Sequence, residues 1–283
     1  MDRRRFLGST AAVMAGLGAA SALSPLKEKP GGGFRTIAYN IYGANGWPKR
    51  RENKWRRQAI HGQMPERIAL ELALYAPDIV SFSEAPEEAK VARIAERLEM
   101  NYAYFPGGFS GAILSRFPIS ASRNHSLPSA DPDAEEPFTR HCGRAVLALP
   151  EGALQVYSVH LHPALHEIRM REVALVQALL EKEPAGASVL VQGDCNHRPD
   201  SPEYGAWREA GLEDTAARGG REPGGTVTSA KPGGRIDYIW AKGPVSARFE
   251  QYRTLYEGAF RLDADDPFAL ALSDHLPVLA DFA

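Results

Sequence analysis

Polar residues that could do chemistry recur at or beside the ends of six short apolar runs in this sequence. The runs are rich in β-branched and aromatic residues, which is typical of buried strands. The polar residues are carboxylates, amides and imidazoles: Asn40, Glu84, His160, Asp194, Asn196, Asp237, Asp274 and His275. One such residue often marks only a turn. Their repetition over six runs predicts a single site at one edge of a sandwich.

Residue types of this kind fit one class of reaction. A hard cation such as magnesium needs oxygen ligands, and it usually takes one or two carboxylates and keeps several waters. Phosphoryl transfer needs charge neutralisation and an aligned nucleophile more than covalent help. The set supplies these parts without a nucleophilic side chain. We therefore predict a metal-dependent hydrolase of phosphate esters, with Mg²⁺ as cofactor and Mn²⁺ as an alternative.

The motif Gly193-Asp194-Cys195-Asn196 follows the apolar run SVLVQ. In an extended segment Asp194 and Asn196 point the same way and Cys195 points the opposite way. Asp194 could then orient or deprotonate a water molecule, while Asn196 donates a hydrogen bond to phosphate and Cys195 packs in the core. A turn after a strand would produce the same letters.

The motif Ser273-Asp274-His275 places a carboxylate beside an imidazole. His275 could bind a phosphate oxygen or act as an acid if a carboxylate partner raises its pKa, and Asp237 is the candidate partner. A turn aspartate with a surface histidine is the simpler alternative.

Two further residues could contact metal or phosphate. Glu84 follows a run too apolar for an exposed strand, so its carboxylate needs a cation or hydrogen bonds. Arg144 opens another run and could clamp phosphate, although an ordinary surface ion pair would also place an arginine there.

Two other hydrolase classes fit poorly. His160 and His162 could share one face of a strand and hold zinc, but a His-x-His-x-Asp motif needs an aspartate where Ala164 stands. The segment around Ser110 lacks the Gly-x-Ser-x-Gly elbow of serine hydrolases, because position 112 is alanine.

The apolar patterns predict elements that alternate along the chain. Helical spacing marks 65–76, 87–100 and 164–182. Strands are expected at 34–42, 78–83, 144–149, 154–161, 188–192, 236–240 and 277–282, and 112–114 and 116–119 flank a further strand region. Hairpins mixed with strand-helix-strand units predict two sheets packed together with helices outside. The long polar segments 43–63 and 216–235 are expected to be loops over the site.

The N-terminal segment reads as a targeting signal. Residues 1–22 combine a basic start with a short Ala/Gly-rich apolar run, and Arg3-Arg4 followed by Phe6 resembles a twin-arginine export signal. An anchor that stays attached is the alternative. We expect a linker at 23–33, one domain at 34–283, a periplasmic or secreted monomer, and no stable membrane insertion after cleavage.

Composition is that of an ordinary globular domain. The chain carries 33 basic and 35 acidic residues, for a formal net charge of -2, and 44% of its residues are hydrophobic. This balance does not favour bulk attraction to nucleic acid, and loss of 1–22 would make it more acidic. The two cysteines, Cys142 and Cys195, are predicted to be buried free thiols.

Taken in order, these motifs resemble the endonuclease/exonuclease/phosphatase (DNase I-like) superfamily. The matching stretches are IAYNIYG, PDIVSFSEA, GAILSRFPI, GRAVLAL, VYSVHLH, VQGDCNHRPDSPEY, RIDYIWAKG and LSDHLPVLADF. Each stretch is weak alone, but eight in the family's order make a specific match. The resemblance implies an α/β/β/α sandwich of four layers with two mixed sheets, and a metal-dependent phosphoesterase activity.

The resemblance also implies roles for individual residues. Glu84 corresponds to the main metal ligand, with Asn40 and Asp274 close by. Asp194 corresponds to the residue that positions the attacking water. The remaining correspondences are phosphate contacts from Asn196 and His160 and a hydrogen-bonded pair of Asp237 with His275. Ser83 and Cys195 depart from the commonest family pattern, but neither is an expected catalytic group.

The substrate is left between two hypotheses. The first is a small or lipid-linked phosphate ester, which the export signal and acidic mature chain favour. The second is nucleic acid, which the basic residues of segment 43–63 could bind along the phosphate backbone while two tryptophans stack on bases. Those residues are Lys49, Arg50, Arg51, Lys54, Arg56, Arg57, Trp47 and Trp55. A binding module without activity would require missing catalytic residues, and none is missing.

Overall fold

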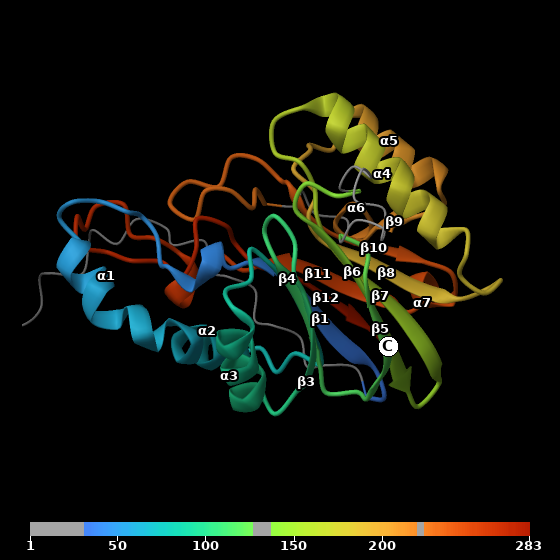
Figure 1. Cartoon of the computed structure of the whole chain (residues 1–283), viewed down its shortest axis with the longest axis horizontal. Helices are drawn as coiled ribbons and strands as arrows, with labels where there is room; N and C mark the ends of the chain where they lie inside the picture. Colours follow the sequence, from blue (N-terminus) through green and yellow to red (C-terminus); the bar gives the residue numbers. More distant parts are fainter. Residues whose placement is uncertain (1–30, 127–136, 220–223) are drawn as a thin grey trace, which may run out of the picture.

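The computed structural model describes residues 31–126, 137–219 and 224–283. The predicted export signal and most of the predicted linker lie outside these residues. Two six-stranded sheets pack face to face, and helices cover the outer face of each (Figure 1). This arrangement confirms the four-layer sandwich expected from the sequence.

The first sheet contains the strands nearest both ends of the domain. Its order is β11 (Phe249–Thr254), β12 (Val278–Phe282), β1 (Phe34–Asn40), β2 (Ile79–Ser83), β4 (Gly111–Ser115) and β3 (Asn101–Phe105). β1 is parallel to β2 and antiparallel to β12, so the sheet is mixed.

The second sheet contains the middle of the chain. Its order is β5 (Ile119–Asn124), β6 (His141–Leu149), β7 (Gly152–His160), β8 (Ser188–Asp194), β10 (Asp237–Lys242) and β9 (Glu213–Asp214). β7 and β8 are parallel, whereas β10 runs antiparallel to β8.

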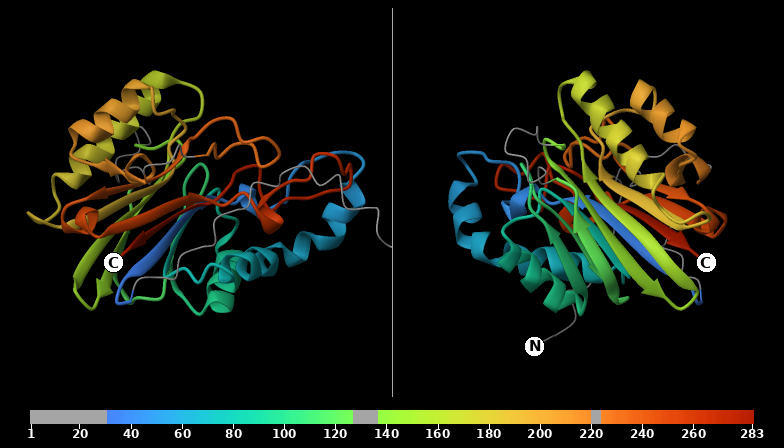
Figure 2. Two further views of the ribbon diagram at one scale, coloured as in Figure 1. Left: turned by 180° about the vertical axis from the view of Figure 1, so that it is seen from behind. Right: turned by 45° about the vertical axis from the view of Figure 1, so that its right-hand side comes forward.

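The helices divide between the two outer faces, as the two views of Figure 2 also show. On the first sheet lie α2 (Met64–Ala73) and α3 (Glu88–Leu98), preceded by α1 (Lys54–Ile60) and the turn η2 (His61–Gln63). On the second lie α4 (His166–Leu180) and α5 (Pro202–Glu209). The short elements are α6 (Thr215–Arg218), α7 (Pro244–Ala247), η1 (Tyr42–Ala44) and η3 (Gly258–Phe260). Among the described helices, none is long and apolar enough to cross a bilayer.

Three apolar clusters hold the four layers together. One lies between the sheets, where Ile113 and Val278 meet Val156 and Ile239. The other two lie under the helices. In one, Ile68 of α2 packs toward the first sheet, together with buried residues of α3. The other lies beneath α4 and α5. Because both faces of each sheet are covered, the strands read as continuous apolar runs rather than as alternating patterns.

Two expectations about elements are corrected. The segment 43–63 is not a continuous loop, because its strong helix formers KWRRQAI fold as α1. The strand region at 112–119 divides between the sheets: β4 ends at Ser115, and the chain turns through Phe117-Pro118 before β5 begins. Cys142 and Cys195 are buried and free, as predicted.

Candidate active site

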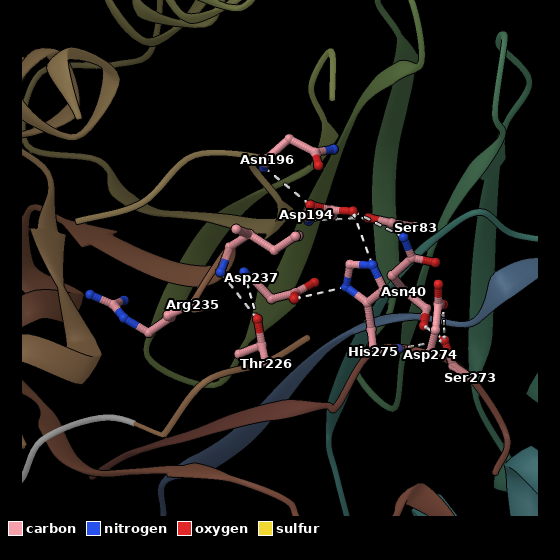
Figure 3. A network of polar contacts seen from close by, with 12 residues as sticks. Asn40, Ser83, Asp194, Asn196, Thr226, Arg235, Asp237, Ser273, Asp274 and His275 are labelled. Carbon is pink, nitrogen blue, oxygen red and sulfur yellow. Dashed lines mark hydrogen bonds and ion pairs between the residues drawn. The ribbon is translucent and has the colours of Figure 1, made fainter. Parts of the chain in front are cut away.

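The strand directions bring the polar strand ends to one edge of the sandwich. The parallel strands β1 and β2 end there, as do β7 and β8 in the other sheet. β10 and β12 run the opposite way and therefore begin there, so that Asp237 is directly opposite Asp194 in register. Polar side chains at or beside these strand ends thus gather at one place, and Figure 3 shows those of Asn40, Asp194, Asp237 and His275.

A buried polar seam joins the two sheets next to this edge. The Ser83 hydroxyl donates to the carbonyl oxygen of Val159 across the sandwich at 3.2 Å. The same hydroxyl oxygen accepts a hydrogen bond from the backbone N–H of Asp194 at 3.3 Å. Further in, Gln192 accepts from the Thr36 hydroxyl at 2.9 Å and donates to Ser81 at 2.7 Å. The seam fixes the position of β8 relative to the opposite sheet.

Asn40 connects carboxylates that come from the two different sheets. Its Nδ2 donates to Glu84 Oε1 at 3.2 Å and to Asp194 Oδ2 at 3.0 Å. Its Oδ1 accepts from the backbone N–H of Tyr42 at 3.1 Å, which sets the orientation of the amide. Asn40 is fully buried.

Asp194 lies at the centre of the cluster. Its Oδ2 is 3.4 Å from His160 Nε2 and 3.8 Å from His275 Nε2. Its Oδ1 accepts from the backbone N–H of Asn196 at 3.1 Å. Burial raises the pKa of this carboxyl above its usual range, although the charge of His275 and the hydrogen bond from Asn40 oppose the shift. Asp194 is thus more basic than an exposed aspartate.

Asp237 and His275 form a hydrogen-bonded pair. His275 Nδ1 is 2.9 Å from Asp237 Oδ2, and both side chains are buried. Burial by itself lowers the pKa of His275, but the carboxylates of Asp237 and Asp194 outweigh burial and raise the pKa to about 10. The imidazole is therefore held protonated, with Nε2 directed toward Asp194 (Figure 3).

Glu84 and Asp274 are the two remaining carboxylates. Burial raises the pKa of Glu84 and the charge of Asp274 raises it further, while the hydrogen bond from Asn40 lowers it. In residues 31–126, 137–219 and 224–283, neither carboxylate forms an ion pair with lysine or arginine. The Ser273 hydroxyl contacts both the Asn40 carbonyl oxygen, at 2.7 Å, and Asp274 Oδ1, at 3.2 Å. Two neighbouring carboxylates without a cation partner fit a divalent metal ion.

A second group of ligand atoms lies close by. Asp194, Asp237 and His275 each offer one potential ligand atom, and these three atoms lie within 4.8 Å of one another. Because His275 is held protonated by Asp237, this group is better suited to proton transfer than to metal binding.

Backbone strain concentrates at the same place. Glu84 and Asn196 have positive φ angles of 50° and 52°, in the left-handed region that costs a non-glycine residue energy. Gly193 has φ of 140°, and a Cβ built there would lie 2.1 Å from the carbonyl oxygen of Val159. Only glycine allows β8 to approach β7 so closely just before Asp194.

The structure does not bring every expected residue into the cluster. Arg144 donates to Glu183 and Gln155 on the outer side of the second sheet, so its guanidinium is already paired and does not face Asp194. The Asn196 amide donates to the Leu161 carbonyl oxygen at 2.9 Å. Arg144 therefore lies outside the cluster in this structure, and its contact with phosphate stays a prediction.

One arginine near the cluster was missed in the sequence. Arg140 lies over the ring of Phe109, with 4.0 Å from its guanidinium carbon to the ring centroid, and the edge of that ring meets His160. Neither residue belongs to a periodic pattern, because both lie outside the strands: Phe109 lies between β3 and β4, and Arg140 directly precedes β6. The position of Arg140 beside a strand that carries His141 was the one available signal.

We predict that Gly193→Ala damages both stability and activity. The added Cβ would displace the β7 carbonyl or β8 itself, and the alanine would also be strained at this φ. We expect a loss of about 2–4 kcal/mol in the free energy of unfolding, measured in urea. Displacement of Asp194 should also lower kcat about 100-fold on any ester that the enzyme hydrolyses.

A matched substitution controls for the change of glycine to alanine. Gly205 lies inside α5 with open space around its Cβ position. Gly205→Ala should leave activity unchanged and increase stability by about 0.5–1 kcal/mol. If Gly193→Ala behaves in the same way, the close approach of β8 and β7 is not required.

Comparison with known proteins places this geometry in a family. The uncharacterized protein YbhP of Escherichia coli strain K12 is 26% identical over 219 residues, which cover 74% of this chain and 85% of YbhP. The mannosyl-6-phosphatase Bt3783 of Bacteroides thetaiotaomicron superposes with a TM-score of 0.70 at 21% identity, covering 87% of this chain and 98% of that one. D. rerio TDP2 complexed with a single-strand DNA product gives 0.64 at 18% identity, with coverages of 89% and 99%.

These two structural likenesses concern the fold, since both identities are low. The sequence model of the Endonuclease/Exonuclease/phosphatase family, in contrast, matches residues 37–275, which include every residue of the cluster. The chain therefore belongs to the Endonuclease/Exonuclease/phosphatase family, whose members hydrolyse phosphate esters.

Proposed function

We propose that this protein is an exported, divalent-metal-dependent phosphodiesterase or phosphatase that acts on a small or lipid-linked phosphate ester. The observation that carries the proposal is the convergence of two kinds of group around Asn40. On one side are Glu84 and Asp274, which lack a cation partner among the described residues, and on the other is Asp194 with its two histidines. Such an arrangement supplies a metal site and a water-activating carboxylate a few ångströms apart.

Asp194 is the residue that positions the attacking water and accepts its proton. Burial raises its pKa toward neutrality, which is where a general base works best. The hydrogen bonds from Asn40 and from the Asn196 backbone hold the carboxylate in one orientation. A fixed carboxylate reduces the entropy cost of aligning water with phosphorus.

His275 and His160 are the groups that contact the phosphate. Asp237 keeps His275 protonated, so the imidazolium can donate a hydrogen bond to a phosphate oxygen whose charge grows during attack. His160 Nδ1 is buried and has no hydrogen-bond partner in the described part of the chain, and its Nε2 lies near Asp194. Asn196 would reach phosphate only by giving up its contact with Leu161.

Glu84, Asn40 and Asp274 are the residues that would hold the cation. The donor set is all oxygen, which suits Mg²⁺ and Mn²⁺ better than zinc. When bound, such an ion neutralises negative charge on the phosphate during attack. The Asn40 amide oxygen keeps one lone pair beyond its bond to the Tyr42 N–H, so it can still serve as a ligand.

We predict that Asp194→Asn nearly abolishes turnover while the fold is retained. The amide has the same shape but cannot accept a proton from water, so kcat should fall by about 10²–10⁴-fold. The measurement is the hydrolysis of a generic aryl phosphodiester and monoester with Mg²⁺, with circular dichroism to confirm folding. The exposed Asp200 offers the same chemical change without effect, as Asp200→Asn. Near-normal rates for Asp194→Asn would reject its role.

We also predict that chelation stops the reaction. EDTA should abolish hydrolysis because Glu84 and Asp274 would face the phosphate without a counter-charge. Activity should return when excess Mg²⁺ or Mn²⁺ is added. Glu84→Gln should need a higher Mg²⁺ concentration for half-maximal rate, whereas Glu151→Gln on the far hairpin should not. Full activity in the chelator would contradict the metal assignment.

A nuclease of the same fold is the second candidate, and one observation favours it. Trp55 on α1 is 61% exposed, and four basic residues around it are exposed as well: Lys49, Arg50, Arg51 and Lys54. Trp47 is less available, because it is only partly exposed. Arg56 is also engaged, since it donates to the carbonyl oxygen of Phe268.

The two candidates predict different effects of one multiple variant. Changing Lys49, Arg50, Arg51 and Lys54 together to glutamine should leave kcat/KM for a small aryl ester within about twofold, because none of them lies in the cluster around Asn40. If the protein is instead a nuclease, the variant should bind single-strand DNA more weakly than the wild type does. The slope of log affinity against log salt should then become shallower by about 0.7 for each phosphate that is no longer neutralised. The control changes four exposed basic residues elsewhere, Arg97, Arg123, Lys182 and Arg208. A large drop in kcat/KM on the small ester would contradict the proposed substrate class.

A further inference from the structure

An arginine on an aromatic platform lies at the rim of the site. The Arg140 guanidinium covers one face of the Phe109 ring at 4.0 Å from its centroid. The Phe109 ring also meets the His160 ring in an edge-to-face arrangement, at 6.0 Å between ring centroids. Phe109 is nevertheless 42% exposed, which is unusual for a large apolar side chain. The pair therefore continues the wall of the site outward from His160.

The backbone around this platform is held closely. A Cβ built on Gly107 would lie 2.1 Å from the carbonyl oxygen of Arg140. A Cβ built on Gly108 would lie 2.3 Å from the carbonyl oxygen of Thr139. His141 Nδ1 donates to the Phe109 carbonyl oxygen at 3.2 Å. The connection that carries Phe109 is thus packed directly against the segment that carries Arg140. The guanidinium is pre-organised rather than free to sample many rotamers.

The charge of Arg140 has no protein counterpart in the part of the chain that the structure describes. No ion pair or hydrogen bond from its guanidinium is found there, and its Nε is buried without a hydrogen-bond partner. The charge does reach the site. Burial lowers the pKa of His160 and the Arg140 charge lowers it further, and the same charge opposes the raised pKa of Glu84.

A buried, unpaired guanidinium N–H is costly unless a ligand completes its hydrogen bonds. The planar fork of arginine matches two oxygens of a phosphate, and stacking on a ring leaves its N–H groups free in the plane. Four carboxylates already lie in the site, and the Arg140 guanidinium pairs with none of them. The ligand that this cation would bind is therefore an anion. The ligand chemistry that fits Arg140 is therefore a phosphate group.

We propose that Arg140, held on the Phe109 ring, forms a phosphate-binding subsite on the His160 side of the cluster and contacts oxygens of the substrate phosphate. This inference rests on the proposed function and deepens it, because it assigns the arginine contact to Arg140 in place of Arg144. Phe109 acts as a positioning residue for the guanidinium. The exposed part of its ring lies where the organic group of the ester would leave the site.

The test measures binding of inorganic phosphate to the full domain at fixed Mg²⁺ by calorimetry, beside the kinetics of an aryl phosphate ester. Arg140→Gln should weaken phosphate binding and raise KM by about 10- to 100-fold, because it removes a charged hydrogen-bond donor. kcat should change less than KM. Arg140→Lys keeps the charge but not the planar guanidinium, so its phosphate affinity and KM should lie between those of the wild type and Arg140→Gln. Arg123→Gln, at an exposed arginine of β5, is the matched control.

The platform is tested by a second pair of variants. Phe109→Leu removes the ring and should weaken phosphate binding in the same direction as Arg140→Gln, whereas Phe109→Tyr keeps the ring and should bind as the wild type does. Phosphate affinity and KM within about twofold of wild type in both Arg140 variants would overturn the subsite. Normal phosphate binding by Phe109→Leu would overturn the platform.

The outcomes separate this inference from the proposed function. If the wild type hydrolyses the esters and both Arg140 variants do so with normal KM, the subsite is wrong and the function stands. If the wild type binds phosphate through Arg140 but hydrolyses no ester in a panel of monoesters and diesters, the subsite stands and the function is wrong. Should Arg140→Gln fail to fold, the Arg140→Lys comparison decides the same question.

Discussion

The two hydrogen bonds of the Asn40 amide are the contacts on which the site depends. One goes to Glu84, which follows β2 in the first sheet, and the other goes to Asp194, which ends β8 in the second. A buried and a half-buried carboxylate repel each other, and each loses part of the solvation that water would give it. A fully buried amide that donates to both offsets part of this cost. It also fixes how far apart the Glu84 carboxylate and the Asp194 carboxylate lie.

This contact works only because the sheets cannot slide past each other. The Ser83 hydroxyl and the Gln192 amide make buried hydrogen bonds across the sandwich, and each would leave an unsatisfied polar group if the register changed. Gly193 lets β8 approach β7 beside the same point. The strained backbone at Glu84 and Asn196 is then tolerated because its surroundings are rigid. Apolar packing holds the layers together, while the polar seam sets their register.

The sequence was informative where a residue's role follows from its place on a strand. A carboxylate or amide at the end of a buried run can be placed at a sheet edge without knowledge of the fold, and this reasoning found Glu84, Asp194 and Asp237. It failed for arginine, because a strand pattern does not say which face a long side chain takes. Arg144 lies on the outer face of β6, where Glu183 pairs with it. Helix α1 was missed for a related reason, since its basic residues resemble those of a polar loop.

The difference between strand residues and loop residues also bears on specificity. The groups around Asp194 come from strand ends that the seam holds in place, and their chemistry is common to any phosphate ester. Phe109 and Arg140 lie outside the strands, in connections of the kind that often carry binding residues. Under the proposed function, the hydrolysis is done by side chains that the seam holds fixed, and contacts with the rest of the substrate come from the connections between strands. If the proposed subsite is correct, Arg140 on the Phe109 ring adds a phosphate contact that comes from these connections rather than from the strand ends.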